Sequence, residues 1–142
     1  MPAVEMKSAA VLARIAARVA ASLLVLTPAF GHHSGSMFEP TKTVTLTGVV
    51  KEFQYTNPHS WLIVYVPNKD GTGTVWGFEA EGPSTLMRAG IRKSDFSPGT
   101  KLTITGHPMR DGRPAATWIS AVRGDGKAFD PHVKGDEQPG EK

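Results

Sequence analysis

Histidines are the residues in this sequence best suited to specific chemistry. The chain has five of them, and it has no cysteine. Imidazole nitrogen binds copper, zinc and nickel, whereas the lack of cysteine excludes thiolate metal sites, disulfides and cysteine nucleophiles. With nitrogen donors and no thiolate, the general order of metal affinities favours Cu(II). The sequence therefore suggests a transition-metal site, provided that the fold brings the histidines together.

The first 31 residues have the features of a secretory signal peptide. A basic start with Lys7 and Arg14 precedes an apolar run at residues 19–26 and small residues at Ala29 and Gly31. We expect cleavage after Gly31 and export to the periplasm or out of the cell. The alternative is an uncleaved membrane anchor, but the apolar run is short for a hydrocarbon layer of about 30 Å.

Cleavage at that point makes His32 the amino-terminal residue. Its free amine and its ring nitrogen are then able to hold one metal ion together, and other imidazoles complete the site. The predicted metal ligands are His32, His33, His59 and His107. Additional donors are available from Met37 and Met109, which suit Cu(I), and from the carboxylate of Glu79.

Each histidine also has a purely structural interpretation. In that case His32 and His33 are a solvated chain start, His59 fixes a turn through hydrogen bonds, and His107 is exposed at a strand end. His132 falls in the C-terminal tail, and we assign it no role.

The alternation of apolar and polar residues predicts five strands and one short helix. The strands are expected at about residues 44–55, 61–66, 74–80, 100–106 and 115–123, followed by a stub that ends at Phe129. The helix follows the third strand, with Gly82 as N-cap, Pro83 at the first helical position and Gly90 at the end. Gly48, inside the first strand, predicts a bulge or a sharp bend.

Three strands, a helix and two further strands are the element order of the oligonucleotide/oligosaccharide-binding (OB) fold. We therefore predict an all-β protein with a five-stranded OB-like barrel. The expected organisation is a signal peptide (1–31), an N-terminal segment (32–42), the barrel (43–123), and a turn with a disordered tail (124–142). An α+β sheet of four strands and one helix is the alternative topology.

Several segments carry a resemblance to a known group of proteins. They include His32-His33-Ser34, residues 37–42, residues 45–48, Asn57-Pro58-His59-Ser60-Trp61, and the stretch 98–112. Together they resemble a bacterial family of small exported proteins of unknown function, marked by an HHS mature start and an NPHSW signature. The resemblance implies export and a compact β domain, and it implies no catalytic residues.

Aromatic residues give a second binding hypothesis. OB folds use aromatic side chains on the outer face of the early strands to stack bases or sugars. The candidate ligand-binding residues are Tyr55, Trp61, Tyr65 and Trp76. The expected signal peptide holds three of the 16 Lys and Arg residues and one of the 13 Asp and Glu residues, which leaves a net charge of about +1. This balance argues against nucleic acid as the ligand, although packing in the core also accounts for the aromatics.

The sequence offers little support for catalysis. Ser60 and His59 are adjacent on a strand and point to opposite faces, and no nucleophile elbow or zinc-protease motif is present. We therefore predict an exported, non-catalytic binding module for a transition metal, with copper favoured, that does not insert in the membrane after signal cleavage. The alternatives are a platform for an envelope glycan, a peptide or a partner protein, and an accessory subunit of an exported enzyme.

Overall fold

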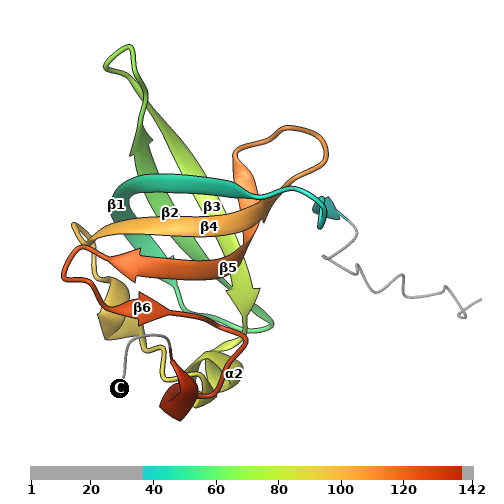
Figure 1. Cartoon of the computed structure of the whole chain (residues 1–142), viewed down its shortest axis with the longest axis vertical. Coiled ribbons are helices and arrows are strands. Elements are labelled where there is room, and N and C mark those ends of the chain that lie inside the picture. The colour runs from blue at the N-terminus through green and yellow to red at the C-terminus, as the bar shows by residue number, and fades with distance from the viewer. Residues whose placement is uncertain (1–36, 139–142) are drawn as a thin grey trace, which may run out of the picture. The chain divides into compact units, whose positions relative to one another are not determined.

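The computed structural model describes residues 37–138 (Figure 1). The expected signal peptide, His32 and His33 lie outside the described residues. Within the described part of the chain, no helix is long and apolar enough to cross a membrane.

Five strands form a closed barrel, which confirms the predicted OB-like fold. The strands are β1 (Val44–Gln54), β2 (His59–Pro67), β3 (Gly73–Glu81), β4 (Lys101–Pro108) and β5 (Ala115–Arg123). Their order in the sheet is β3-β2-β1-β4-β5, and a parallel pairing of β3 with β5 closes the barrel. The short strand β6 (Ala128–Phe129) pairs with β5, as the predicted stub requires.

The alternation in β2 shows how the sequence builds the barrel wall. Leu62 and Val64 are fully buried and face the interior, together with Phe78 of the paired strand β3. Trp61 and Tyr65 have the opposite parity and face outward. Residues of β3 that pair with Trp61 and Tyr65 therefore also face outward, and Glu79 is one of them.

The first strand bends as predicted, although the bulge itself lies slightly farther along. The pairing of β1 with β2 shifts register between Val50 and Glu52. Gly48 lies at a close crossing, because a Cβ atom there would overlap the backbone oxygen of Tyr65 and lie 2.7 Å from Val64 Cγ1. The strand pairs with β2 on one side and with β4 on the other, so this bend lets the sheet curl into a barrel.

Helix α2 (Pro83–Arg88) begins and ends where the sequence predicts. Gly82 is the N-cap, and Gly90 has a φ of 73°. At the end, the N–H of Ile91 donates to Leu86 O at 2.8 Å and the N–H of Gly90 donates to Met87 O at 3.0 Å. These two bonds are the Schellman pattern, and Leu86 and Ile91 are both fully buried.

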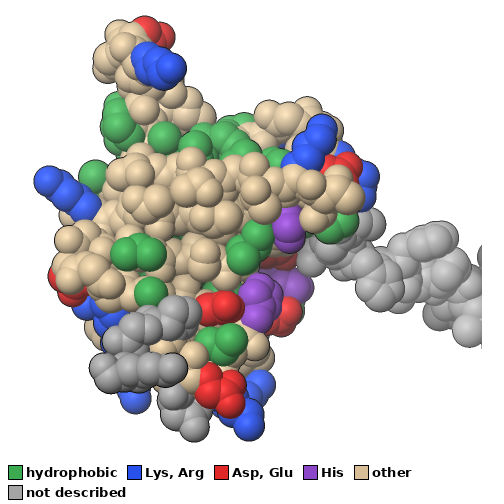
Figure 2. Space-filling view, viewed as in Figure 1, with side chains coloured by type: hydrophobic (Ala, Val, Ile, Leu, Met, Phe, Trp, Pro, Cys, Tyr) green, Lys and Arg blue, Asp and Glu red, His purple; other side chains and the backbone are tan. Residues whose placement is uncertain are grey.

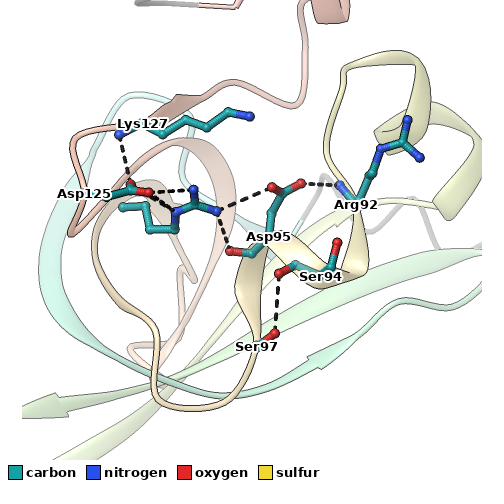
Figure 3. Close-up of polar contacts among 7 residues, drawn as sticks. Arg92, Ser94, Asp95, Ser97, Asp125 and Lys127 are labelled. Carbon is teal, nitrogen blue, oxygen red and sulfur yellow. Dashed lines mark hydrogen bonds and ion pairs between the residues drawn. The ribbon is translucent and has the colours of Figure 1, made fainter.

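A 3₁₀ turn, η2 (Lys93–Phe96), follows the helix and was not predicted from the sequence. Figure 3 shows how its Asp95 joins a polar cluster with Asp125 and Lys127. Arg123 of β5 lies between the two acids, 3.4 Å from Asp95 Oδ1 and 2.7 Å from Asp125 Oδ2. Hydrogen bonds from Arg123 lower the pKa of Asp125 to about 2. The contacts of Arg123 with Asp95 tie η2 to the last strands.

The prediction of a disordered C-terminal tail is wrong for residues 131–138. This segment contains a second 3₁₀ turn, η3 (Gly135–Glu137), and it packs beside α2. Gln138 is buried, and its amide donates to Ala89 O and to Asp130 O, each at 2.8 Å. Its Oε1 accepts the N–H of Asp130 at 2.7 Å. A single buried glutamine thus fastens the segment, and composition alone gave no sign of it.

Candidate functional site

A buried acid on the outside of the barrel is the centre of the candidate site. Glu79 follows Phe78 in β3 and has the opposite parity, so it faces away from the core, yet its side chain is only 7% exposed. Trp61 of β2 and Thr117 of β5 pair with it on either side. Its Oε1 lies 3.2 Å from Nδ1 of His59, the first residue of β2.

The other carboxylate oxygen of Glu79 is buried without a partner. Among the described residues, Oε2 has no hydrogen-bond partner. A buried, unsatisfied carboxylate oxygen is costly in free energy, and in a native structure such a group needs an explanation, such as a bound water or ion or a catalytic role. The unpaired oxygen of Glu79 is therefore a candidate ligand-binding atom.

Glu79 lines a cavity of about 200 Å³ at the end of the barrel, which we call the rim pocket. Its lining consists of His59, Glu79, Ala80, Glu81, Thr117, Trp118, Pro131 and His132. Figure 2 shows histidine side chains gathered beside acidic ones at one edge of the molecule. The rim pocket thus joins β2, β3 and β5 to the C-terminal segment.

His107 lies on the same outer surface, one strand beyond Thr117. It is the partner of Thr117 in the β4–β5 pairing, and Thr117 is the partner of Glu79 in the β3–β5 pairing. With neighbouring strands about 4.8 Å apart, the His107 backbone is about 10 Å from that of Glu79. Barrel closure therefore brings the beginning of β2 and the end of β4 to one rim.

The three described histidines share one feature that bears on metal binding. The ring Nδ1 of His107 lies 2.7 Å from Lys42 O, and the ring Nε2 of His132 lies 3.2 Å from Trp118 O. A carbonyl oxygen only accepts, so in each case that ring nitrogen carries the proton and donates. When the imidazole is neutral, the other nitrogen has a free lone pair. His59 also has one ring nitrogen next to an oxygen, since its Nδ1 lies 3.2 Å from Glu79 Oε1 in an ion-pair contact.

Orientation of this kind is what metal-binding histidines require, because a second hydrogen bond fixes the tautomer and the ring. The described residues nevertheless include no group of three or more His, Cys, Asp or Glu that could hold a metal as they stand. The donors are thus near one rim but not converged. The two further predicted ligands, His32 and His33, are outside the described residues.

The two predicted methionine donors, Met37 and Met109, lie near this rim, but one is exposed and the other is buried. Phe38 and Met109 form an isolated antiparallel bridge, and both are buried. Met37 is 41% exposed, and its carbonyl oxygen accepts the N–H of Arg110 at 2.9 Å. The segment before β1 is thereby fixed along the loop that follows β4.

Comparison with known proteins places the chain in a family. Residues 19–118 match the model of a family of unknown function, DUF6152. The chain belongs to the DUF6152 family. No curated protein and no solved structure matches it. The match includes His59, Glu79 and His107 of this DUF6152 chain, but ends before His132.

The four predicted aromatic ligand-binding residues of the DUF6152 chain divide between two environments. Tyr55 packs against the core, its hydroxyl donates to Pro83 O and Ile91 O at 3.1 and 2.9 Å, and burial raises its pKa. Trp76 also packs against the core and stacks on Phe78, with ring centroids 6.2 Å apart. Only Trp61 and Tyr65 share the outer face of β2, so only these two are placed together.

Reasoning from the sequence identified His59, His107 and Glu79 at this rim and missed His132. Glu79 was found through its parity, because alternation along a strand is visible in the sequence. His132 lies in a segment of charged, Gly-rich and Pro-rich composition, where local patterns predict no fixed structure. The segment is held by Gln138, but its role is visible only from its buried hydrogen bonds and not from the sequence.

Proposed function

We propose that the protein is an exported, non-catalytic module that binds a transition metal, with copper favoured, at the rim that carries His59 and His107. The observation that supports this most directly is that each described histidine has one ring nitrogen beside an oxygen. For His107 and His132 this is a hydrogen bond, and for His59 it is a 3.2 Å contact with Glu79, so the other ring nitrogen of each is free to coordinate. The donor set contains imidazole and no thiolate, which suits Cu(II). His32 and His33 supply the remaining nitrogen donors.

The placement of the segment before β1 supports a role for the amino terminus. The N–H of Glu39 donates to Pro108 O at 2.9 Å, directly beside His107. His33 is four residues before Met37, so the length of the chain allows at most about 14 Å between them. The described chain thus begins beside the end of β4, where Met37 O accepts the N–H of Arg110 at 2.9 Å.

The proposal is tested with full-length precursor that the cell exports and processes with its own leader. Mass spectrometry of the product should give His32 as the first residue. Titration with Cu(II), followed by electron paramagnetic resonance, should show a 1:1 complex with nitrogen hyperfine structure. His59→Ala or His32→Ala should weaken Cu(II) binding by about tenfold or more, since each removes an imidazole ligand.

Glu52→Gln provides the control, because Glu52 is an exposed acid on β1 that should leave the Cu(II) affinity unchanged. The metal proposal fails if the processed protein forms no 1:1 complex. It also fails if the loss of His59 and the loss of His32 both leave the affinity as it was.

A specific observation favours a second function, the binding of an envelope glycan on the outer face of β2 and β3. A Cβ atom on Gly77 would lie 3.1 Å from the Trp61 ring, and one on Gly73 would overlap the Tyr65 ring. Glycines on β3 thus let both rings lie across the sheet, and Tyr65 is 40% exposed. Aromatic rings that present a face to solvent are suited to stacking on a sugar.

Tryptophan fluorescence tests this second function. Soluble envelope glycan fragments should shift the emission of the wild-type protein, and Trp61→Phe should abolish the shift. Trp76→Phe removes a tryptophan that packs on the core, so that variant should keep the shift. An emission spectrum that does not change with glycan would exclude the platform.

A further inference from the structure

We infer that the rim pocket holds the metal between Glu79 Oε2 and the ring of His132, so that metal binding fastens residues 131–134 to the barrel. This inference rests on the proposed metal function and extends it to two residues that the predicted four-histidine site does not contain. It also makes the C-terminal segment, which lies beyond the family match, part of the site.

Glu79 provides a fixed donor on the barrel side of the pocket. It belongs to β3, pairs with strands on both sides, and has a side chain of which only 7% is exposed. Its Oε1 is occupied by His59 Nδ1, while Oε2 has no partner among the described residues. A cation bound at Oε2 would remove the cost of burying that oxygen unsatisfied.

His132 provides the second donor from the opposite wall of the rim pocket. Its Nε2 donates to Trp118 O, which leaves the lone pair of Nδ1 free in the neutral ring. Its backbone N–H donates to Asp130 Oδ1 at 2.8 Å, and this bond fixes the turn that presents the ring. A carbonyl on one ring nitrogen and a metal on the other is the common arrangement of histidine ligands.

The geometry also indicates which side of the rim pocket must move when a metal binds. No group of three donors converges in the described residues, so a chelate with His59, Glu79 and His132 requires one of them to shift. The strand residues are held by sheet pairing, whereas the His132 side chain is held by one bond of 3.2 Å. His132 lines both the rim pocket and a second cavity of about 210 Å³ beside α2, so its side chain has space on two sides.

The ends of the segment limit this movement. Asp130 and Gln138 are joined by two hydrogen bonds, 2.7 and 2.8 Å long, and Gln138 also donates to the oxygen of Ala89, the C-cap of α2. Closure on the metal is therefore confined to the stretch between them. It should appear as slower amide exchange at residues 132–134 with little change elsewhere in the segment.

The experiment compares the processed wild-type protein with His132→Gln and Lys134→Ala. The glutamine side chain of the first variant keeps a donor for Trp118 O but lacks the imidazole, so Cu(II) affinity should fall about tenfold or more. Lys134→Ala changes the same segment without removing a donor and should retain the wild-type affinity. Hydrogen exchange with and without Cu(II) should show protection of residues 132–134 in the wild type and in Lys134→Ala, and no protection in His132→Gln.

The outcomes separate this inference from the function on which it rests. Failure of the wild-type protein to bind Cu(II) overturns both. Normal Cu(II) binding that His132→Gln does not weaken overturns the role of His132 alone. Equal melting temperatures of the metal-free proteins show that a loss of affinity is not a loss of folding.

Discussion

Replacing Gly48 by alanine is expected to lower the free energy of unfolding by about 3 kcal/mol or more, because the new methyl group has no room. Its Cβ atom would overlap the backbone oxygen of Tyr65 and approach Val64 Cγ1 at 2.7 Å. Both neighbours belong to β2, and backbone atoms move only if the pairing of β1 with β2 moves. For a barrel of this size the melting temperature should fall by about 12 °C or more.

Backbone flexibility alone predicts that this substitution would raise the free energy of unfolding. Alanine restricts the unfolded chain more than glycine does, which by itself would stabilise the protein by about 0.4–1 kcal/mol. Gly124→Ala is the control, since its nearest neighbours, Lys101 Cβ and Lys101 O, would both be 3.3 Å away and need to move only slightly. Urea denaturation of the two variants measures the difference. A Gly48→Ala protein as stable as the wild type would show that the bend in β1 does not depend on glycine.

The same position shows why the fold was largely predictable. A glycine inside an alternating strand has few explanations other than a bend, and a small closed barrel needs one. The helix was equally accessible, because Gly82, Pro83 and Gly90 determine its start and its end within a few residues. These signals are local, so they need no knowledge of what packs against them.

Features that depend on long-range partners were not accessible in this way. The order of Pro131–Gln138 rests on hydrogen bonds that the Gln138 side chain makes to α2 and to Asp130. The turn η2 is held by Arg123, which lies 28 residues along the chain from Asp95. Neither contact leaves a periodic trace in the sequence. The candidate site combines both kinds of feature. Its strand residues, such as His59 and Glu79, were predicted from the sequence, whereas its C-terminal residues Pro131 and His132 were not.

Replacing Glu79 by glutamine is expected to change stability and metal affinity in opposite directions. The substitution removes a buried charge that has one unpaired oxygen, and it keeps an amide oxygen able to accept from His59 Nδ1. We expect the free energy of unfolding of the metal-free protein to rise by about 1 kcal/mol. Cu(II) affinity should fall by about tenfold or more, because the neutral amide is a poor substitute for a carboxylate ligand.

Glu52→Gln is the matched control, because it removes the same charge from an exposed position on the neighbouring part of the sheet. Its stability should stay within about 0.5 kcal/mol of the wild type, with no loss of Cu(II) affinity. Urea denaturation and Cu(II) titration of both variants measure the two effects. A buried acid that serves only the fold should lose stability when it is neutralised, so a destabilised Glu79→Gln protein with normal Cu(II) binding would assign Glu79 to the structure. A gain in stability with a loss of binding is the behaviour of a residue kept for its ligand at the expense of the fold.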